Sequence, residues 1–173
     1  ANETIIRSNT NNRYKWLFGM FAFNQQAENT VDVNSYKTKT DTGLVHYTYQ
    51  KQYGPVSSGV AVFHQSSYNI IPQLTLTAGI RLDYEQSSIQ YKYNGIMGET
   101  VQTPVDTVYP ALRDMVVLPK LAIAYAPGDK INVYASYSTG YKPGGFNSTF
   151  EKPEHMMFKK EISHNYEAGV KVN

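Results

Sequence analysis

A strict two-residue alternation of apolar and polar side chains constrains this chain more than any other feature. In LTLTAGIRLDYE (74–85), the even positions from Leu74 to Tyr84 are apolar or aromatic, and the odd positions from Thr75 to Glu85 are polar or glycine. An amphipathic helix would instead place apolar residues three and four positions apart. Period two puts the two classes on opposite faces of a β-strand. The segment is therefore predicted to be a strand with one apolar face.

The same alternation recurs along most of the chain. It is clean in segments 116–126, 131–141 and 161–173, and weaker in 13–24 and 57–70, while 3–8 reads as the tail of another strand. Several of these roughly seven strands reach about 11–13 residues, against about 5–6 in soluble domains. A tilted strand that crosses a bilayer needs roughly 9–11 residues. Strand length therefore favours a membrane sheet.

The connections between these strands come in two sizes that alternate along the chain. Short turns are expected at 9–12, 72–73 and 127–130, and long connections at about 25–56, 88–115 and 143–158. In a meander, alternate connections lie at the same end, so one end carries tight turns and the other long loops, as in outer-membrane barrels. Tyr84, Tyr125 and Tyr141 end apolar faces, as interfacial aromatic residues do. We predict an all-β, antiparallel up-and-down meander that is part of a transmembrane β-barrel.

Composition excludes several other classes of protein. The 173 residues fit a single region, and a net charge of +2 without a dense Lys/Arg cluster gives no sign of nucleic-acid binding. Cysteine is absent, which excludes disulfides and thiolate metal sites. No apolar run approaches the roughly 20 residues of a membrane helix. The opening ANETIIRSN lacks the features of a signal peptide, as expected of a mature or excised chain.

Two segments near the end of the chain, VYASYSTGYKPGGFN and FKKEISHNYEAGVKVN, carry a recognisable pattern. They are similar to the pair "hY.sys.GyrpGGfN" and "f..E.s..yE.GlK" of TonB-dependent outer-membrane receptors of the ferric-siderophore type. Upstream, VAVFHQSSYNIIPQLTLTAGIRLDYE resembles a hairpin of the same family, and IIRSN…RYKWLFGMFAF the hairpin before it. The matching residues include Phe63, Gly79, Arg81, Asp83, Glu85, Tyr134, Tyr137, Gly140, Tyr141, Gly144, Gly145, Phe146, Asn147, Phe158, Glu161, Tyr166, Glu167, Gly169 and Lys171.

The resemblance implies a bacterial outer-membrane receptor that imports a siderophore–iron complex or a similar small nutrient complex. It implies no enzyme activity and no cofactor. The partners it implies are outer-membrane lipid, the remainder of the receptor, and the TonB complex acting through a plug domain. Siderophore, haem, cobalamin and glycan receptors share these motifs, so the ligand stays open.

The family's barrels have 22 strands around a plug, whereas this chain offers about seven strands, no recognisable plug and no aromatic C-terminal end. We therefore interpret residues 1–173 as one region, an internal piece of the barrel wall. Two alternatives stay open: a small complete eight-stranded outer-membrane barrel with an adhesive or structural role, and a soluble β-sandwich binding module.

The first long connection holds the strongest candidate ligand residues. The segment 36–54 contains Tyr36, His46, Tyr47, Tyr49 and Tyr53 among polar residues, a composition that can grip a siderophore or a sugar face. The alternative is that the strands continue beyond the bilayer as a solvated extension, which the β-propensity of the segment favours. His155, beside Met156 and Met157 in a second loop, is a weaker candidate. Without a second ligand in view, no metal site is predicted there.

The remaining motifs are predicted to be structural. Arg81, Asp83 and Glu85 share one strand face, and Glu161, Glu167 and Lys171 share another, as expected of ion pairs that line a polar lumen. KPGGFN fits neither a P-loop nor a dinucleotide fingerprint and is predicted to be a turn. In the strand 131–141, we expect Ile131, Val133 and Ala135 to face lipid, Asn132, Ser136 and Ser138 to face the lumen, and Tyr141 to lie at the outer interface.

Overall fold

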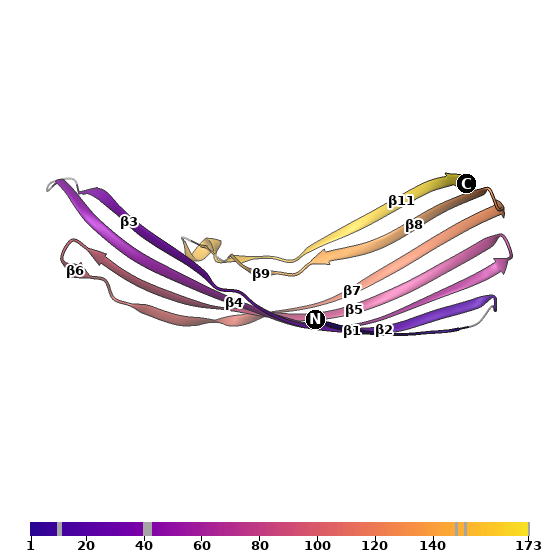
Figure 1. Cartoon of the computed structure of the whole chain (residues 1–173), viewed down its shortest axis with the longest axis horizontal. Helices are drawn as coiled ribbons and strands as arrows, with labels where there is room; N and C mark the ends of the chain where they lie inside the picture. The colour runs from indigo at the N-terminus through magenta and orange to yellow at the C-terminus, as the bar shows by residue number, and fades with distance from the viewer. Residues whose placement is uncertain (10–11, 40–42, 148, 151, 173) are drawn as a thin grey trace.

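The computed structural model describes residues 1–9, 12–39, 43–147, 149–150 and 152–172, and shows one large curved β-sheet and a small two-stranded sheet (Figure 1). Its long strands are β1 (Asn2–Arg7), β2 (Tyr14–Gln26), β3 (Asn29–Lys39), β4 (Gly43–Ile71), β5 (Leu74–Met97), β7 (Val105–Gly128), β8 (Ile131–Lys142) and β11 (Glu161–Val172). The short elements are β6 (Thr100–Val101), β9 (Gly145–Phe146), the 3-10 turn η1 (Pro153–His155) and β10 (Met157–Phe158). Among the described residues, no helix has the length and apolar character needed to cross a membrane.

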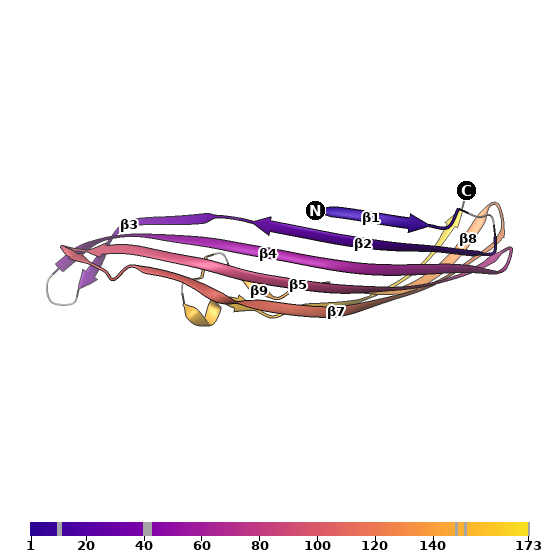
Figure 2. The same ribbon diagram turned by 90° about the horizontal axis from the view of Figure 1, so that it is seen from below.

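The main strands form an antiparallel meander in the order β1-β2-β4-β5-β7-β8-β11, as predicted. β3 pairs with the part of β4 beyond β2, and β6 pairs with β5. The sheet is one layer deep (Figure 2), β1 and β11 are the edges of its main strand order, and β3 is an edge of the extended part. Within the described part of the chain, this open single layer matches neither a closed eight-stranded barrel nor a two-layer sandwich.

The two ends of the sheet differ, as the sequence indicated. Turns at 72–73 and 129–130 join β4 to β5 and β7 to β8 at one end, while the expected turn at 9–12 lies partly outside the described residues. At the other end, the long connections 25–56 and 88–115 lie beyond the tight-turn side as predicted, and the strand extension that the β-propensity of 36–54 favoured is confirmed. These segments are mostly β-structure, because β3, β4, β5 and β7 keep pairing with one another.

The pairing makes some strands far longer than a bilayer requires. β4 has 29 residues, or about 95 Å at ~3.3 Å per residue, whereas a bilayer takes roughly 9–11 residues. Residues Leu74 to Tyr84, counted from the tight-turn end of β5, are enough to cross a bilayer, which takes roughly 9–11 residues. On this count, residues from Glu85 onward lie beyond the spanning part.

Strand register joins the apolar positions into one continuous convex face. Val62, Leu82 and Val117 lie side by side on β4, β5 and β7, and Ile123, Ala135 and Ala168 on β7, β8 and β11. Many large side chains of this face are exposed, among them Phe18, Met20, Val60, Val62, Ile80, Val117, Leu121, Ile123, Val133 and Val170. Ile131 and Val133 share this face, as predicted. It is the face a bilayer would cover.

The concave face carries the only hydrophobic core cluster found among the described residues. The described residues of segment 143–160 (143–147, 149–150 and 152–160), here called the strap, turn back over this face and lie against β4, β5 and β7 (Figure 1). Its side chains bury a small cluster formed by Tyr53, Ile89, Phe146, Phe150 and Met156. The expected external loop at 143–158 is thus a strap packed on the sheet.

Candidate functional site on the concave face

Arg81 lies on the concave face, where a carboxylate and two aromatic rings contact its guanidinium. Its Nε and Nη2 atoms donate to Oδ2 and Oδ1 of Asp83, each at 2.8 Å. The guanidinium also lies over the rings of Phe21 and Phe63, 5.7 and 5.5 Å from their centroids. A planar cation between two rings and a carboxylate is held by both stacking and bidentate hydrogen bonding. This arrangement fixes the Arg81 side chain on the sheet, and the guanidinium is bound by protein groups.

Above this pair lies a group of carboxylates. Glu85 of β5 stands opposite Asp114 of β7 in the strand register. Burial raises the pKa of Glu85, the nearby Asp114 and Asp83 charges act in the same direction, and a hydrogen bond from Tyr141 opposes them. The two ends of the strap meet beside Asp114, and we call this meeting point the neck of the strap. There the Gly144 amide and the Lys160 ammonium group both contact Asp114.

Among the three predicted interfacial tyrosines, the position predicted for Tyr141 is wrong. Its hydroxyl donates to Glu85 Oε2 at 3.4 Å on the concave side, whereas the alternation placed Tyr141 on the lipid face. β8 stops pairing with β7 at Ser138, and the next β7 residue along the ladder is Pro119, whose carbonyl points to Thr139 Oγ1 at 3.3 Å. In antiparallel pairs a residue's N–H and C=O face the same neighbour, so proline removes the donor that would extend this ladder. β8 then diverges toward the concave side. Tyr84 and Tyr125 are exposed on the convex face, as expected.

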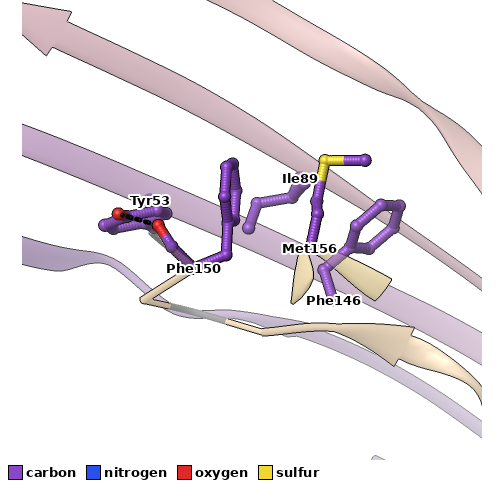
Figure 3. Close-up of a cluster of buried hydrophobic side chains, with 5 residues drawn as sticks. All are labelled: Tyr53, Ile89, Phe146, Phe150 and Met156. Carbon is purple, nitrogen blue, oxygen red and sulfur yellow. Dashed lines mark hydrogen bonds between the residues drawn. The ribbon is translucent and has the colours of Figure 1, made fainter. Parts of the chain in front are cut away.

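The strap covers Tyr53, one of the predicted ligand residues. Tyr53 is 0% exposed, and its hydroxyl donates to the backbone oxygen of Phe150 at 2.8 Å (Figure 3). The Phe150 ring lies 5.4 Å from Tyr53, 5.0 Å from Tyr91 and 6.1 Å from Tyr109. A ligand has no access to Tyr53 in this structure. Tyr53 packs under the strap and is hydrogen-bonded to it.

The other predicted ligand residues of 36–54 divide between the two faces of the extended hairpin. Tyr47 and Tyr49 are half-buried on the face continuous with Tyr53, and their rings stack 6.0 Å apart. Tyr36 and His46 pair across β3 and β4 on the opposite face, 5.0 Å apart, and His46 Nε2 contacts Asn34 Oδ1 at 2.6 Å. The structure therefore brings Tyr47 and Tyr49 together and separates them from Tyr36 and His46.

His155 lies in η1 and is exposed, next to the buried Met156. Its backbone oxygen accepts a hydrogen bond from the Asn147 side chain within the strap. In the described residues, no group of three or more His, Asp or Glu side chains is close enough to hold a metal ion.

The motif residues of the last two strands pack on one another rather than around a pocket. Tyr134 of β8 donates to Glu167 Oε1 at 2.7 Å and covers Gly169. On the convex face, the rings of Tyr137 and Tyr166 lie 5.1 Å apart. The other members lie at paired or turn positions: Gly79 opposite Gln65, Gly140 opposite Ser163, Glu161 opposite Lys142, Lys171 opposite Asn132, and Gly144, Gly145, Phe146 and Asn147 in the strap.

Sequence reasoning missed part of the concave surface. Tyr93 lies 6.0 Å from Tyr49, and the Lys51 ammonium lies 4.9 Å above the Tyr49 ring. The signal was present as a period of two, at 47, 49, 51 and 53 and at 91 and 93, within segments predicted to be long connections. Tyr47, Tyr49 and Tyr93 together form an aromatic surface, here called the tyrosine patch, and the Lys51 side chain beside them is buried.

Comparison with known proteins gives two findings. A family model described as "TonB dependent receptor-like, beta-barrel" matches residues 2–173. Among solved structures, the chain is similar to the ferric yersiniabactin uptake receptor FyuA from Yersinia pestis, with a TM-score of 0.74 and 20% sequence identity. The match covers 99% of this chain and 25% of FyuA, so the chain spans about a quarter of that receptor's length.

Proposed function

The chain belongs to the β-barrel part of the TonB-dependent receptor family, a transport and receptor family of the bacterial outer membrane, and from this premise we propose that it forms a segment of the barrel wall in a receptor that imports a siderophore–iron or similar nutrient complex. The observation that carries the proposal is the family match over residues 2–173. Two faces of different character support it. The convex face is apolar and exposed across the spanning parts of the strands, and the concave face carries ion pairs and aromatic rings.

The proposed receptor is larger than this chain. The unpaired edges β1 and β11 would be completed by neighbouring barrel strands, because an open apolar sheet is prone to aggregate. We propose that the rest of the receptor supplies these strands and a plug domain, through which the TonB complex acts. Residues 1–173 would then be one region of wall without a plug of their own.

Ligand contact on this segment is assigned to the tyrosine patch. Tyr47, Tyr49 and Tyr93 are half-buried, so each ring is fixed by neighbours yet keeps an accessible surface. Tyrosine rings with polar tips suit a small ligand that has both flat and polar parts. The Lys51 side chain is buried, and its ammonium packs over the Tyr49 ring, which helps to fix that ring. The patch lies beyond the spanning part of the wall, where an arriving ligand would meet it first.

The test is uptake by the full-length receptor that contains this segment. The receptor is expressed in a host without other iron-uptake receptors, and growth under iron limitation is measured with a panel of ferric siderophores, with and without a functional TonB system. TonB-dependent growth on at least one iron complex is expected. Haem is included as a further iron source, and uptake of radiolabelled cobalamin is measured separately because cobalamin contains no iron.

Each outcome is informative. TonB-dependent uptake of haem or cobalamin alone would support the receptor function and overturn the siderophore assignment. Failure of a correctly inserted receptor to import any probe would overturn the uptake proposal. Import that persists without TonB would overturn the proposed coupling.

A further inference from the structure

We propose that the strap is a permanently docked lining of the wall, and that Asp114 is the positioning residue that latches both of its ends. The inference rests on the proposed function only in treating the concave face as the lumen of a barrel. Residues 148 and 151 of the strap lie outside the described residues and carry no part of it.

The latch is a single carboxylate that binds the two ends of the strap. Asp114 Oδ2 accepts a hydrogen bond from the Gly144 amide at 3.0 Å, and Oδ1 lies 3.4 Å from the Lys160 ammonium. The Asp114 side chain is 18% exposed and that of Lys160 is 41% exposed, so the carboxylate is partly shielded from water while the ion pair stays open to screening by salt. The negative charge of the Asp114 carboxylate makes both of these contacts stronger than contacts to a neutral acceptor. Because the two ends meet at one group, releasing Asp114 frees the neck of the strap as a whole.

Gly144 fits this neck because it has no side chain. A Cβ at this position would lie 3.1 Å from Asp114 Oδ2, 3.1 Å from the Phe158 backbone oxygen and 3.2 Å from the Lys160 nitrogen. Two of these three neighbours are backbone atoms of the returning end of the strap. The neck is therefore closed as tightly as a glycine permits.

The body of the strap is fastened by apolar burial. Phe146, Phe150 and Met156 are each less than a tenth exposed, and the Tyr53 and Ile89 side chains beneath them are fully buried (Figure 3). The Tyr53 hydroxyl adds a hydrogen bond to the Phe150 backbone. Opening the strap would expose all five side chains at once.

The strap also satisfies much of its own backbone. Phe146 pairs with Met157 and Gly145 with Phe158, and the Asn147 amide donates to the Met156 oxygen at 2.9 Å. It can therefore move as one hairpin or stay docked, and its two fastenings favour the docked state. A solute passing along the concave face would then meet the exposed Met157 and His155 side chains instead of Tyr53.

The test measures amide hydrogen exchange of the full-length receptor in detergent, followed by mass spectrometry of peptides within 143–147 and 152–160. The variants are Asp114→Ala, which removes the latch, and Asp114→Asn, which keeps an acceptor for Gly144 and loses the charge that attracts Lys160. Lys160→Met removes the ion pair from the other side, and serves if the Asp114 variants fail to insert. The matched control is Asp106→Ala, since Asp106 also lies on β7 but pairs with Lys92 away from the strap.

In the wild-type receptor, strap amides are expected to exchange more slowly than those of the connection 98–104. Asp114→Ala should accelerate them about tenfold, Asp114→Asn and Lys160→Met less, and Asp106→Ala not at all. Raising the salt concentration should accelerate exchange in the wild type and leave Asp114→Asn nearly unchanged, because only an ion pair is screened. If Asp114 acted only through the packing of its side chain, and not through its charge, the two proteins would respond to salt in the same way.

The proposal is overturned if wild-type strap amides exchange as fast as those of 98–104, which would mean a mobile lid. It is also overturned if Asp114→Ala behaves like Asp106→Ala. Neither result depends on transport, so a receptor that imports none of the probes can still show a docked strap.

Discussion

The ring of Phe63 lies directly over Gly19, its partner across β2 and β4, where a Cβ would stand 2.1 Å from the ring. Two other cross-strand pairs repeat the arrangement: Phe23 covers Gly59 and Tyr134 covers Gly169, at 2.5 and 2.7 Å. All six residues lie on the concave face. A ring laid over glycine shields backbone that the missing side chain leaves open.

Gly19→Ala should destabilise the receptor by about 1–2 kcal/mol, because the new methyl group displaces the Phe63 ring and with it the contact to Arg81. The free energy of unfolding is measured by urea titration of the full-length receptor in lipid. Gly128→Ala is the control, since nothing lies within 4 Å of a Cβ there. Equal stability of the two variants would mean that the ring adjusts without cost.

Arg81→Lys should also destabilise the receptor, by about 1 kcal/mol, although the charge is kept. Lysine cannot reproduce the paired hydrogen bonds to Asp83 or the planar contact with Phe21 and Phe63. Arg113→Lys, at an exposed position of β7, is expected to change stability by less than about 0.5 kcal/mol. The same urea titration compares them, and indistinguishable midpoints would show that Arg81 acts only as a charge.

Glu85 predicts a dependence of stability on pH. Its pKa is raised in the folded state, so between the unfolded value of about 4.3 and the folded value the folded chain holds a proton that the unfolded chain has lost. The free energy of unfolding therefore falls as pH rises through this window and stays lower above it. Glu85→Gln should be more stable than the wild type near neutral pH, and this advantage should disappear as pH falls toward 4.3.

The experiment compares Glu85→Gln with wild type across the acid-to-neutral range. Glu99→Gln, which changes an exposed carboxylate near the far end of β5, is the control. A stability difference that stays constant with pH for Glu85→Gln would show that burial does not govern this carboxyl group.

In the parts of the strands that span the bilayer, the sequence predicts correctly which face each side chain occupies. In β5, the alternation from Leu74 to Tyr84 predicts both the strand and the face that Leu82 shares with Val117. This works because a bilayer requires an unbroken apolar face, which leaves a strong pattern. Strand length and the alternation of short and long connections predicted the meander and the membrane setting, and the family motifs added the class of receptor.

Beyond the spanning parts the pattern is weaker, and tertiary pairing decides. Segment 88–97 carries polar residues and Gly95, yet it is strand because β4 and β7 pair with it on both sides. The position of Tyr141 depends on the break in pairing at Pro119, and the burial of Tyr53 depends on Phe150, 97 residues away. The two-residue alternation within one strand carries no information about the break in pairing or about the contact with Phe150.

Tyr49 and Tyr53 should respond differently to substitution, although both were predicted from the same segment as ligand residues. Tyr49→Ala removes an accessible ring of the tyrosine patch and is expected to raise the half-saturating ligand concentration for uptake several-fold, with little effect on stability. Tyr53→Phe removes only the hydrogen bond to Phe150 and should cost about 1 kcal/mol of stability while leaving that concentration unchanged. Both quantities are measured on the full-length receptor with the iron complex that supports growth. Tyr36→Ala, on the opposite face of the hairpin, is the control and should match wild type. If Tyr36→Ala impairs uptake as much as Tyr49→Ala, the ligand surface is the whole hairpin tip, and the assignment to the concave face is wrong.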